Sequence, residues 1–296
     1  MKKFHISRIL IPVDFSETSL LALEHAVLMA KLLKAEITLL HVIESLTYTS
    51  AIGHSAVNDF EAEVEKSANA RLAELAAKLS REGATVKTMI EVGRIYRQVV
   101  EAALKIKADL VIMGTHGVSG FREFLIGSNA SRVVSEAACP VITVQSHAKT
   151  IGFKNIVLPI DNTQYSRQKV RYAHELADKY GSKVHLLGIL PAEGVEEENK
   201  FRIKIRQVEE YLSKHNIVYT SGYLSAKGGN AAKTALDYAT SVNGDLLMIM
   251  SESEFDSSGL LLGPSARQTV NHSTIPVMCV APDVNYTGVD LHGYGF

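Results

Sequence analysis

The chain has 296 residues, of which 46% are hydrophobic and 21% charged, and its formal net charge is −1. This length predicts two domains of about 150 residues each, and the balanced charge argues against a protein that binds nucleic acid or an anionic membrane. No run of about eighteen apolar residues occurs, and the apolar run after the basic N-terminus is too short for a signal peptide. The two cysteines, Cys139 and Cys279, favour buried thiols in the cytoplasm over a disulfide framework.

The first half alternates short apolar runs with amphipathic helical patterns. Ser16 is placed to cap the first helix, because a serine side chain accepts a hydrogen bond from a backbone N–H of the first turn. Since strands and helices alternate throughout, the order predicts a parallel, doubly wound sheet with right-handed crossovers. Strands are expected at residues 8–14, 36–42, 85–90, 108–113 and 140–144, and helices at 17–34, 58–81, 93–107 and 127–137.

One stretch of the first half has the composition of a phosphate-binding loop. It begins at the end of the fourth strand with Met113-Gly114-Thr115-His116-Gly117 and resumes after nine residues with Gly127-Ser128-Asn129, where a helix begins. Glycine lets a backbone approach a ligand, and the N–H groups of a helix N-terminus attract phosphate. The spacing is neither that of a Walker A loop nor Gly-x-Gly-x-x-Gly, so a plain strand–turn–helix connection is the alternative.

The second half repeats the first. Residues 155–161 restate residues 8–14 at an offset of 147, and residues 245–250 restate residues 109–114 at an offset of 136. The difference between the offsets falls between the second and third strands, where the second copy has a shorter loop and helix. The repeat predicts a first domain at 1–146, a second at 153–283, and a tail at 284–296 to which we assign no structure.

Taken together, these motifs resemble the universal stress protein family in its tandem two-domain form. The likeness is carried by Ile9-Leu10-Ile11-Pro12-Val13-Asp14-Phe15-Ser16, by Leu39-Leu40-His41-Val42, by Gly114-x2-Gly117-x9-Gly127-Ser128, and by Cys139-Pro140-Val141. The resemblance implies an α/β fold in which each half has a five-stranded parallel sheet of order 3-2-1-4-5. Ligands of such sheets bind outside the carboxyl ends of strands 1 and 4, where the strand order reverses.

The resemblance also implies an ATP site in the first half, and we expect one ATP per chain with Mg²⁺ on its phosphates. Asp14 has a structural alternative, a turn or capping role, because Asp161 matches it in the half that lacks the glycines. The residues implied are Pro12, Val13 and Asp14 on the adenosine side, Val42 at the adenine, Met113 and Gly114 under the ribose and phosphates, and Gly117, Gly127, Ser128 and Asn129 at the phosphates.

The second half is predicted not to bind ATP. Gly114 becomes Met250, Gly117 becomes Ser253 and Ser128 becomes Pro264, which removes room and donors for phosphate. Three carboxylates also enter the corresponding loop and would repel a triphosphate, namely Glu252, Glu254 and Asp256.

The last strand of each half, at 141–144 and at 277–280, is short, apolar and placed at a sheet edge. An open apolar edge invites pairing, and the family commonly dimerises through this strand. We therefore expect the two edges to pair within one chain as a pseudo-dimer, while a homodimer of whole chains stays open.

The leading functional hypothesis is a regulatory protein of the stress response, whose ATP occupancy changes its contacts with an unidentified protein partner. The alternatives are a structural or interaction pseudo-dimer without nucleotide, and an ATP-using enzyme such as a weak ATP hydrolase. No Gly-x-Ser-x-Gly elbow, no paired carboxylates at a strand end and no base beside Ser128 occur, nor does the spacing of a protein metal site. The sequence therefore supports at most slow ATP hydrolysis.

Overall fold

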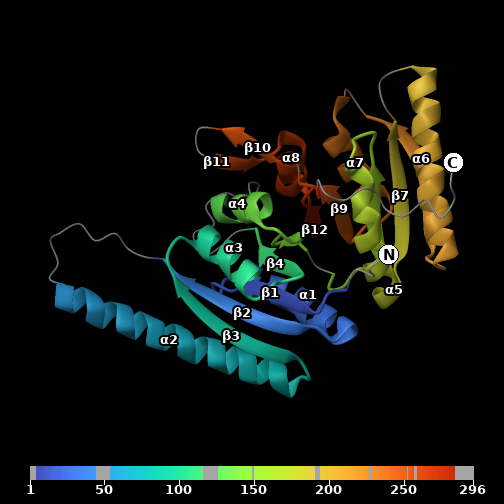
Figure 1. The fold of residues 1–296 in the computed structure, drawn as a ribbon. Helices are drawn as coiled ribbons and strands as arrows, with labels where there is room; N and C mark the ends of the chain where they lie inside the picture. The colour runs from blue at the N-terminus through green and yellow to red at the C-terminus, as the bar shows by residue number, and fades with distance from the viewer. Residues whose placement is uncertain are drawn as a thin grey trace.

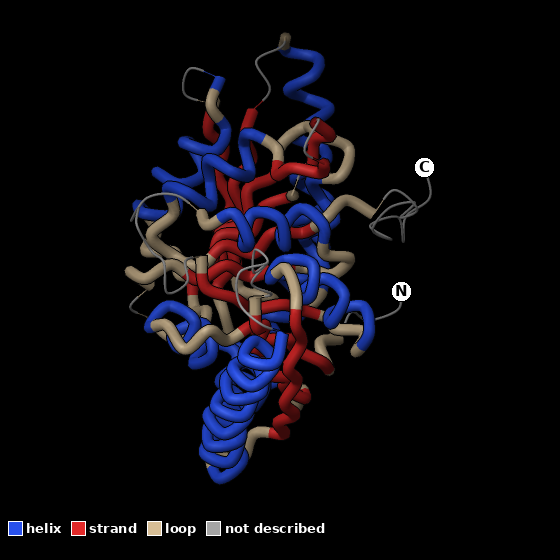
Figure 2. Tube along the Cα trace, turned by 90° about the vertical axis from the view of Figure 1, so that its left-hand side faces the viewer, coloured by secondary structure: helices blue, strands red, loops and turns tan. Residues whose placement is uncertain are grey.

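A computed structural model of the chain describes residues 5–44, 54–115, 126–148, 150–190, 194–226, 229–251, 253–256 and 259–283. Its main feature is one ten-stranded sheet, which Figure 2 shows between helices on either side. None of the described helices is long and apolar enough to cross a membrane.

The elements of the first half follow the predicted alternation, and Figure 1 shows them on one side of the molecule. Ser16 caps the first helix as predicted, since its Oγ accepts from the backbone N–H of Ser19 at 3.2 Å, and Lys34 ends that helix in the left-handed conformation at φ 56°. The elements are β1 (Arg8–Pro12), α1 (Glu17–Leu33), β2 (Glu36–Ile43), α2 (His54–Arg81), β3 (Thr85–Val92), α3 (Ile95–Lys105), β4 (Leu110–Gly114), α4 (Ser128–Glu136) and β5 (Val141–Val144).

The second half has the same order with two differences. Its first helix starts with a 3₁₀ turn, and an antiparallel hairpin, β10–β11, follows β9 where a loop was predicted. The elements are β6 (Asn155–Ile160), η1 (Ser166–Lys169), α5 (Val170–Tyr180), β7 (Lys183–Leu190), α6 (Val195–Lys214), β8 (Tyr219–Ser225), α7 (Ala231–Ser241), β9 (Leu246–Met250), β10 (Ser253–Asp256), β11 (Gly259–Leu262), α8 (Pro264–His272) and β12 (Val277–Val280).

The strand order is β3-β2-β1-β4-β5-β12-β9-β6-β7-β8, so each half has the predicted order 3-2-1-4-5. The halves join where β5 and β12 pair antiparallel, with Ile142 opposite Met278 and Thr143 opposite Val277. Thr143 adds a side-chain hydrogen bond across this junction, because its Oγ1 donates to the Val277 carbonyl at 3.3 Å. The predicted pseudo-dimer within one chain is confirmed.

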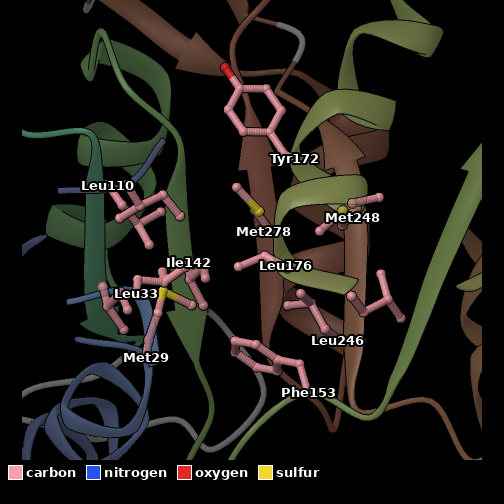
Figure 3. Packing of buried hydrophobic residues seen from close by; sticks show 14 of the residues in the cluster. Met29, Leu33, Leu110, Ile142, Phe153, Tyr172, Leu176, Leu246, Met248 and Met278 are labelled. Carbon is pink, nitrogen blue, oxygen red and sulfur yellow. The ribbon is translucent and has the colours of Figure 1, made fainter. Parts of the chain in front are cut away.

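The apolar core has two layers, one on each face of the sheet. Helices α1, α2, α5 and α6 cover one face, and α3, α4, α7 and α8 cover the other. Figure 3 shows the first layer crossing the junction, where Met29 and Ile142 of the first half lie near Met278 and Phe153. Burial on both faces explains why the central strands are continuous apolar runs. Of the two free cysteines, Cys279 is buried as predicted, whereas Cys139 is only half-buried.

Each half also fixes its β1-like strand against its β4-like strand with one aspartate. Asp109 Oδ2 accepts from the N–H of Ser7 and of Arg8, both at 2.9 Å. Asp245 repeats this with the N–H groups of Lys154 and Asn155, both at 2.8 Å. The two strands that border the predicted crevice are therefore held in register at their amino ends.

Candidate functional site

The carboxyl ends of β1 and β4 border a cavity of about 400 Å³. This is the point where the strand order reverses, so the loops after the two strands diverge and leave a crevice. Gly117 lies outside the described residues. The other predicted site residues all line the cavity: Pro12, Val13, Asp14, Val42, Met113, Gly114, Gly127, Ser128 and Asn129.

Six further lining residues were missed by the sequence reasoning. Leu40 and Ile95 add apolar side chains to the cavity lining, as Val42 does, and Glu44 adds a carboxylate to that of Asp14. Leu40 could have been found from its place two residues before Val42 on the same strand, whereas Ile95 and Glu44 carry no local motif. The six residues are Ser19, Leu40, Glu44, Ile95, Thr115 and Ala130.

The first turn of α4 also forms part of the cavity lining. Gly127 is the N-cap of this helix, and no side chain caps it. The N–H groups of Ser128, Asn129 and Ala130 begin the helix, and such first-turn groups have no acceptor within their own helix. All three residues line the cavity, so the positive end of the helix dipole borders it.

Gly114 and Gly127 allow close packing within the protein, whereas glycines here were expected to let the backbone approach a ligand. A Cβ on Gly114 would lie 2.9 Å from Cγ2 of Thr18, so the missing side chain lets α1 approach the end of β4. A Cβ on Gly127 would lie 3.0 Å from the carbonyl oxygen of Thr115, which accepts the Gly127 N–H at 2.9 Å. These glycines shape the cavity by letting its walls close on one another.

Asp14 has the structural role that was weighed for it and also lines the cavity. Its Oδ1 accepts from the N–H of Ser16 at 3.0 Å and from the Ser16 hydroxyl at 2.6 Å, which supports the start of α1. Asp161 repeats the contact with the N–H of Thr163 at 2.9 Å. The aspartate therefore organises the strand–helix corner in both halves, and only in the first does that corner border a large cavity.

The loop after β1 is held by contacts among His41, Phe15 and Arg71. His41 Nδ1 donates to the Val13 carbonyl at 2.7 Å. Phe15 lies in the left-handed region at φ 64°, and its ring centroid is 5.1 Å from that of His41. The Arg71 guanidinium of α2 covers the Phe15 ring at 3.9 Å from its centroid. Asp14 lies between the two contact residues Val13 and Phe15, so these contacts restrain its backbone.

The corresponding crevice of the second half encloses only about 50 Å³. Lys169 stands there in the place of Ala22, is buried, and has its Nζ 3.4 Å from Ser166 Oγ. Burial would raise the pKa of Asp161, but the Lys169 ammonium and hydrogen bonds from Thr163 and Ser166 outweigh it, so that the pKa is lowered. The second crevice is therefore lined by a buried ammonium group whose charge favours the ionised form of Asp161.

Two of the residues expected to disable the second crevice fall on described elements. Met250 lines the reduced cavity in the place of Gly114, and its partly buried side chain packs against the core. Pro264 is the first residue of α8, whose N-cap Gly263 has nearly the backbone conformation of Gly127. Ser253, Glu254 and Asp256 lie on strand β10. Glu252 and the side chains of the β10 residues lie outside the described part.

The amino-acid sequence of the chain matches the model of a known protein family over two separate ranges. The family model described as universal stress protein family matches residues 5–145 and again residues 152–281. The chain belongs to the universal stress protein family. Its two matches make it a tandem universal stress protein, and their bounds agree with the two halves of the sheet.

Relatives of the universal stress protein align with one half or with both. A universal stress protein of Methanocaldococcus jannaschii is 34% identical over 145 residues, which cover 48% of this chain and 84% of the relative. A universal stress protein of Mycolicibacterium smegmatis is 25% identical over 289 residues, or 93% of this chain and 97% of the relative. The structure of a universal stress protein from Archaeoglobus fulgidus has the same fold, with a TM-score of 0.71, 18% identity, and coverage of 95% of this chain and 98% of that one.

Proposed function

We propose that this universal stress protein binds one ATP per chain in the crevice between β1 and β4, and that occupancy of the crevice regulates its contacts with a protein partner in the stress response. The observation that supports this is the cavity of about 400 Å³, whose lining combines apolar side chains with the N-terminus of α4. Its volume is in the range of small-molecule sites, about 300 to 1,000 Å³.

The two kinds of lining suit the two parts of a nucleotide. Leu40, Val42 and Ile95 offer apolar surface to a base, while the N–H groups of Ser128 and Asn129 suit phosphate oxygens. The carboxylates of Asp14 and Glu44 fit a magnesium ion, which proteins usually hold through one or two carboxylates together with phosphate oxygens. Bound magnesium would screen the negative charge of the phosphates.

The second half, in this proposal, is a partner and scaffold that binds no ATP. Its crevice is occupied by Lys169 and Met250, and Pro264 lacks the N–H that Ser128 offers. We propose no dedicated hydrolase, and turnover is at most slow. The free cysteines suit a reducing compartment, which supports placement in the cytoplasm.

Calorimetric titration of the full chain with MgATP tests the proposal, and we expect a stoichiometry near one. Ser128→Pro copies the residue of α8 and removes one N–H and the hydroxyl. Proline is tolerated at the first position of a helix, and Gly127 already has the extended conformation that a following proline requires. The variant should fold and bind ATP at least tenfold more weakly, about the effect of one lost charge-assisted hydrogen bond.

Ser128→Ala is the matched control, because it removes the hydroxyl and keeps the N–H. Its affinity should lie between those of the unmodified protein and Ser128→Pro. Equal affinity of all three proteins for MgATP, or a stoichiometry of two, would refute the assignment of the phosphate site to the first turn of α4.

A further inference from the structure

The start of α4 is held by a side chain of the second half. The N–H of Ile126, immediately before the N-cap Gly127, donates to Oδ1 of Asn271 at 2.7 Å. Asn271 lies in the last turn of α8 and is partly buried. The next N–H along the chain, that of Gly127, donates to the Thr115 carbonyl within the first half. One contact from each half therefore fixes the backbone that leads into the first turn of α4.

The surroundings of this contact are packed across the junction between the halves. Strand β11 lies against α4, as Figure 1 also shows. Val133 of α4 and Val270 of α8 belong to the same buried apolar cluster, which continues through the paired strands β5 and β12. Because such a core resists deformation, the position of α8 is transmitted to α4.

The two halves carry different residues at this position. The residue of the first half that corresponds to Asn271 is Ser135, and its hydroxyl donates to the Ser131 carbonyl of its own helix at 2.9 Å. Asn271 and Ser135 differ in length and in hydrogen-bonding groups, so the contact of Asn271 with Ile126 cannot be copied by the same side chain from the first half.

We infer that the second half regulates the proposed ATP site of the first, with Asn271 as the positioning residue that sets the N-terminus of α4. This inference rests on the proposed function. A phosphate bound to the first turn of α4 requires that turn to be in place, so holding it in advance lowers the cost of ordering. Coupling between two sites is reciprocal, so phosphate binding in turn stabilises α8 and β11.

The test compares the affinities of ATP, ADP, AMP and adenosine for the full chain and two variants. Asn271→Leu removes the acceptor at similar volume, whereas Asn271→Asp keeps an acceptor oxygen. We expect Asn271→Leu to bind ATP about five- to tenfold more weakly, as for one lost hydrogen bond, and to bind adenosine unchanged. Asn271→Asp should recover most of the ATP affinity at moderate salt.

Thr143→Val is the matched control, because it removes another hydrogen bond across the junction without touching α4. It should leave all four affinities unchanged. If Asn271→Leu weakens adenosine as much as ATP, or if Thr143→Val has the same effect, the contact only stabilises the junction and the inference is overturned.

Amide hydrogen exchange in the absence of nucleotide gives a separate readout. Exchange at Ile126 should be faster in Asn271→Leu than in the unmodified protein or in Thr143→Val, and MgATP should slow exchange in residues 259–272 of the unmodified protein. Failure of the unmodified protein to bind ATP would overturn the proposed function alone, since Ile126 exchange would still decide whether Asn271 positions α4. Unchanged Ile126 exchange in Asn271→Leu would overturn the inference.

Discussion

His25 should make the stability of the protein fall as the pH falls below neutrality. This residue of α1 is fully buried, and its ring stacks on Phe153 with centroids 5.4 Å apart and planes 19° apart. Among the described residues, neither ring nitrogen has a hydrogen-bond partner. Burial therefore disfavours the charged imidazolium and lowers the pKa of His25 from 6.5 to about 4.

The sign and size of the effect follow from proton linkage. Between pH 6.5 and pH 4 the unfolded chain binds a proton at His25 and the folded chain does not, so stability decreases as the pH falls. Each pH unit in this window changes the free energy of unfolding by about 1.4 kcal/mol, and the full shift amounts to about 3 kcal/mol. His185, whose pKa is also lowered, by burial and by Lys183, adds a contribution of the same sign.

Urea unfolding followed by far-ultraviolet circular dichroism measures this dependence, because the chain has no tryptophan for fluorescence. His25→Phe keeps a ring on Phe153 and should remove about 1 kcal/mol of the stability loss between pH 7.5 and 5.5. His147→Phe, at an exposed position, is the control and should keep the original slope. If His25→Phe shows the same pH dependence of the unfolding free energy as the unmodified protein, the imidazole of His25 is not held in its neutral form in the folded state.

Three further predictions concern packing and charge. Ile142→Pro, in the centre of the β5–β12 junction, should cost about 3 kcal/mol and expand the molecule in small-angle scattering, because proline disrupts a central ladder. Lys169→Ala should destabilise the protein by about 2 kcal/mol in thermal unfolding near neutral pH, because Asp161 loses its ammonium partner. Gly114→Ala should cost about 1 to 3 kcal/mol in urea unfolding, because its Cβ would meet Thr18 at 2.9 Å.

Each of these has its own check. A Thr143→Pro variant placed on the same strand should separate the halves like Ile142→Pro, and undisturbed scattering in both would show that the junction does not depend on β5. The cost of Lys169→Ala should shrink as the pH falls through the range in which Asp161 takes up a proton, because the lowered pKa of Asp161 contributes stability only above that range. Gly222→Ala, with no atom within 4 Å of the added Cβ, should cost less than Gly114→Ala.

The sheet and the residues around its crevice could be predicted because they follow from local patterns and an internal repeat. The positions of the strands followed from apolar runs and the repeat, whereas the order 3-2-1-4-5 and the pairing of the two last strands were implied by the family resemblance. Pro12, Asp14 and Gly127 could be placed together because parallel strands end at one edge of the sheet, so two separate motifs converge there.

The remaining features depend on contacts between distant segments. Asn271 and Ile126 are 145 residues apart, and neither belongs to a motif. Lys169 could be aligned with Ala22 from the repeat. Its burial and its electrostatic effect on Asp161 could not be predicted, because they depend on the packing of the folded chain. Gly114 was recognised as a required glycine for a different reason, since a missing Cβ indicates a close approach without saying which partner approaches.

Joining the two halves in one polypeptide releases the β5–β12 junction from symmetry. In a dimer of identical subunits every residue of a twofold interface occurs on both sides, so a substitution that helps one side acts on the other as well. Here Asn271 of the second half contacts the first half, while Ser135 occupies the equivalent position in the first half. A covalent link between the halves lets one side of the interface specialise as support and the other as receptor, a division of labour that a dimer of identical copies cannot encode.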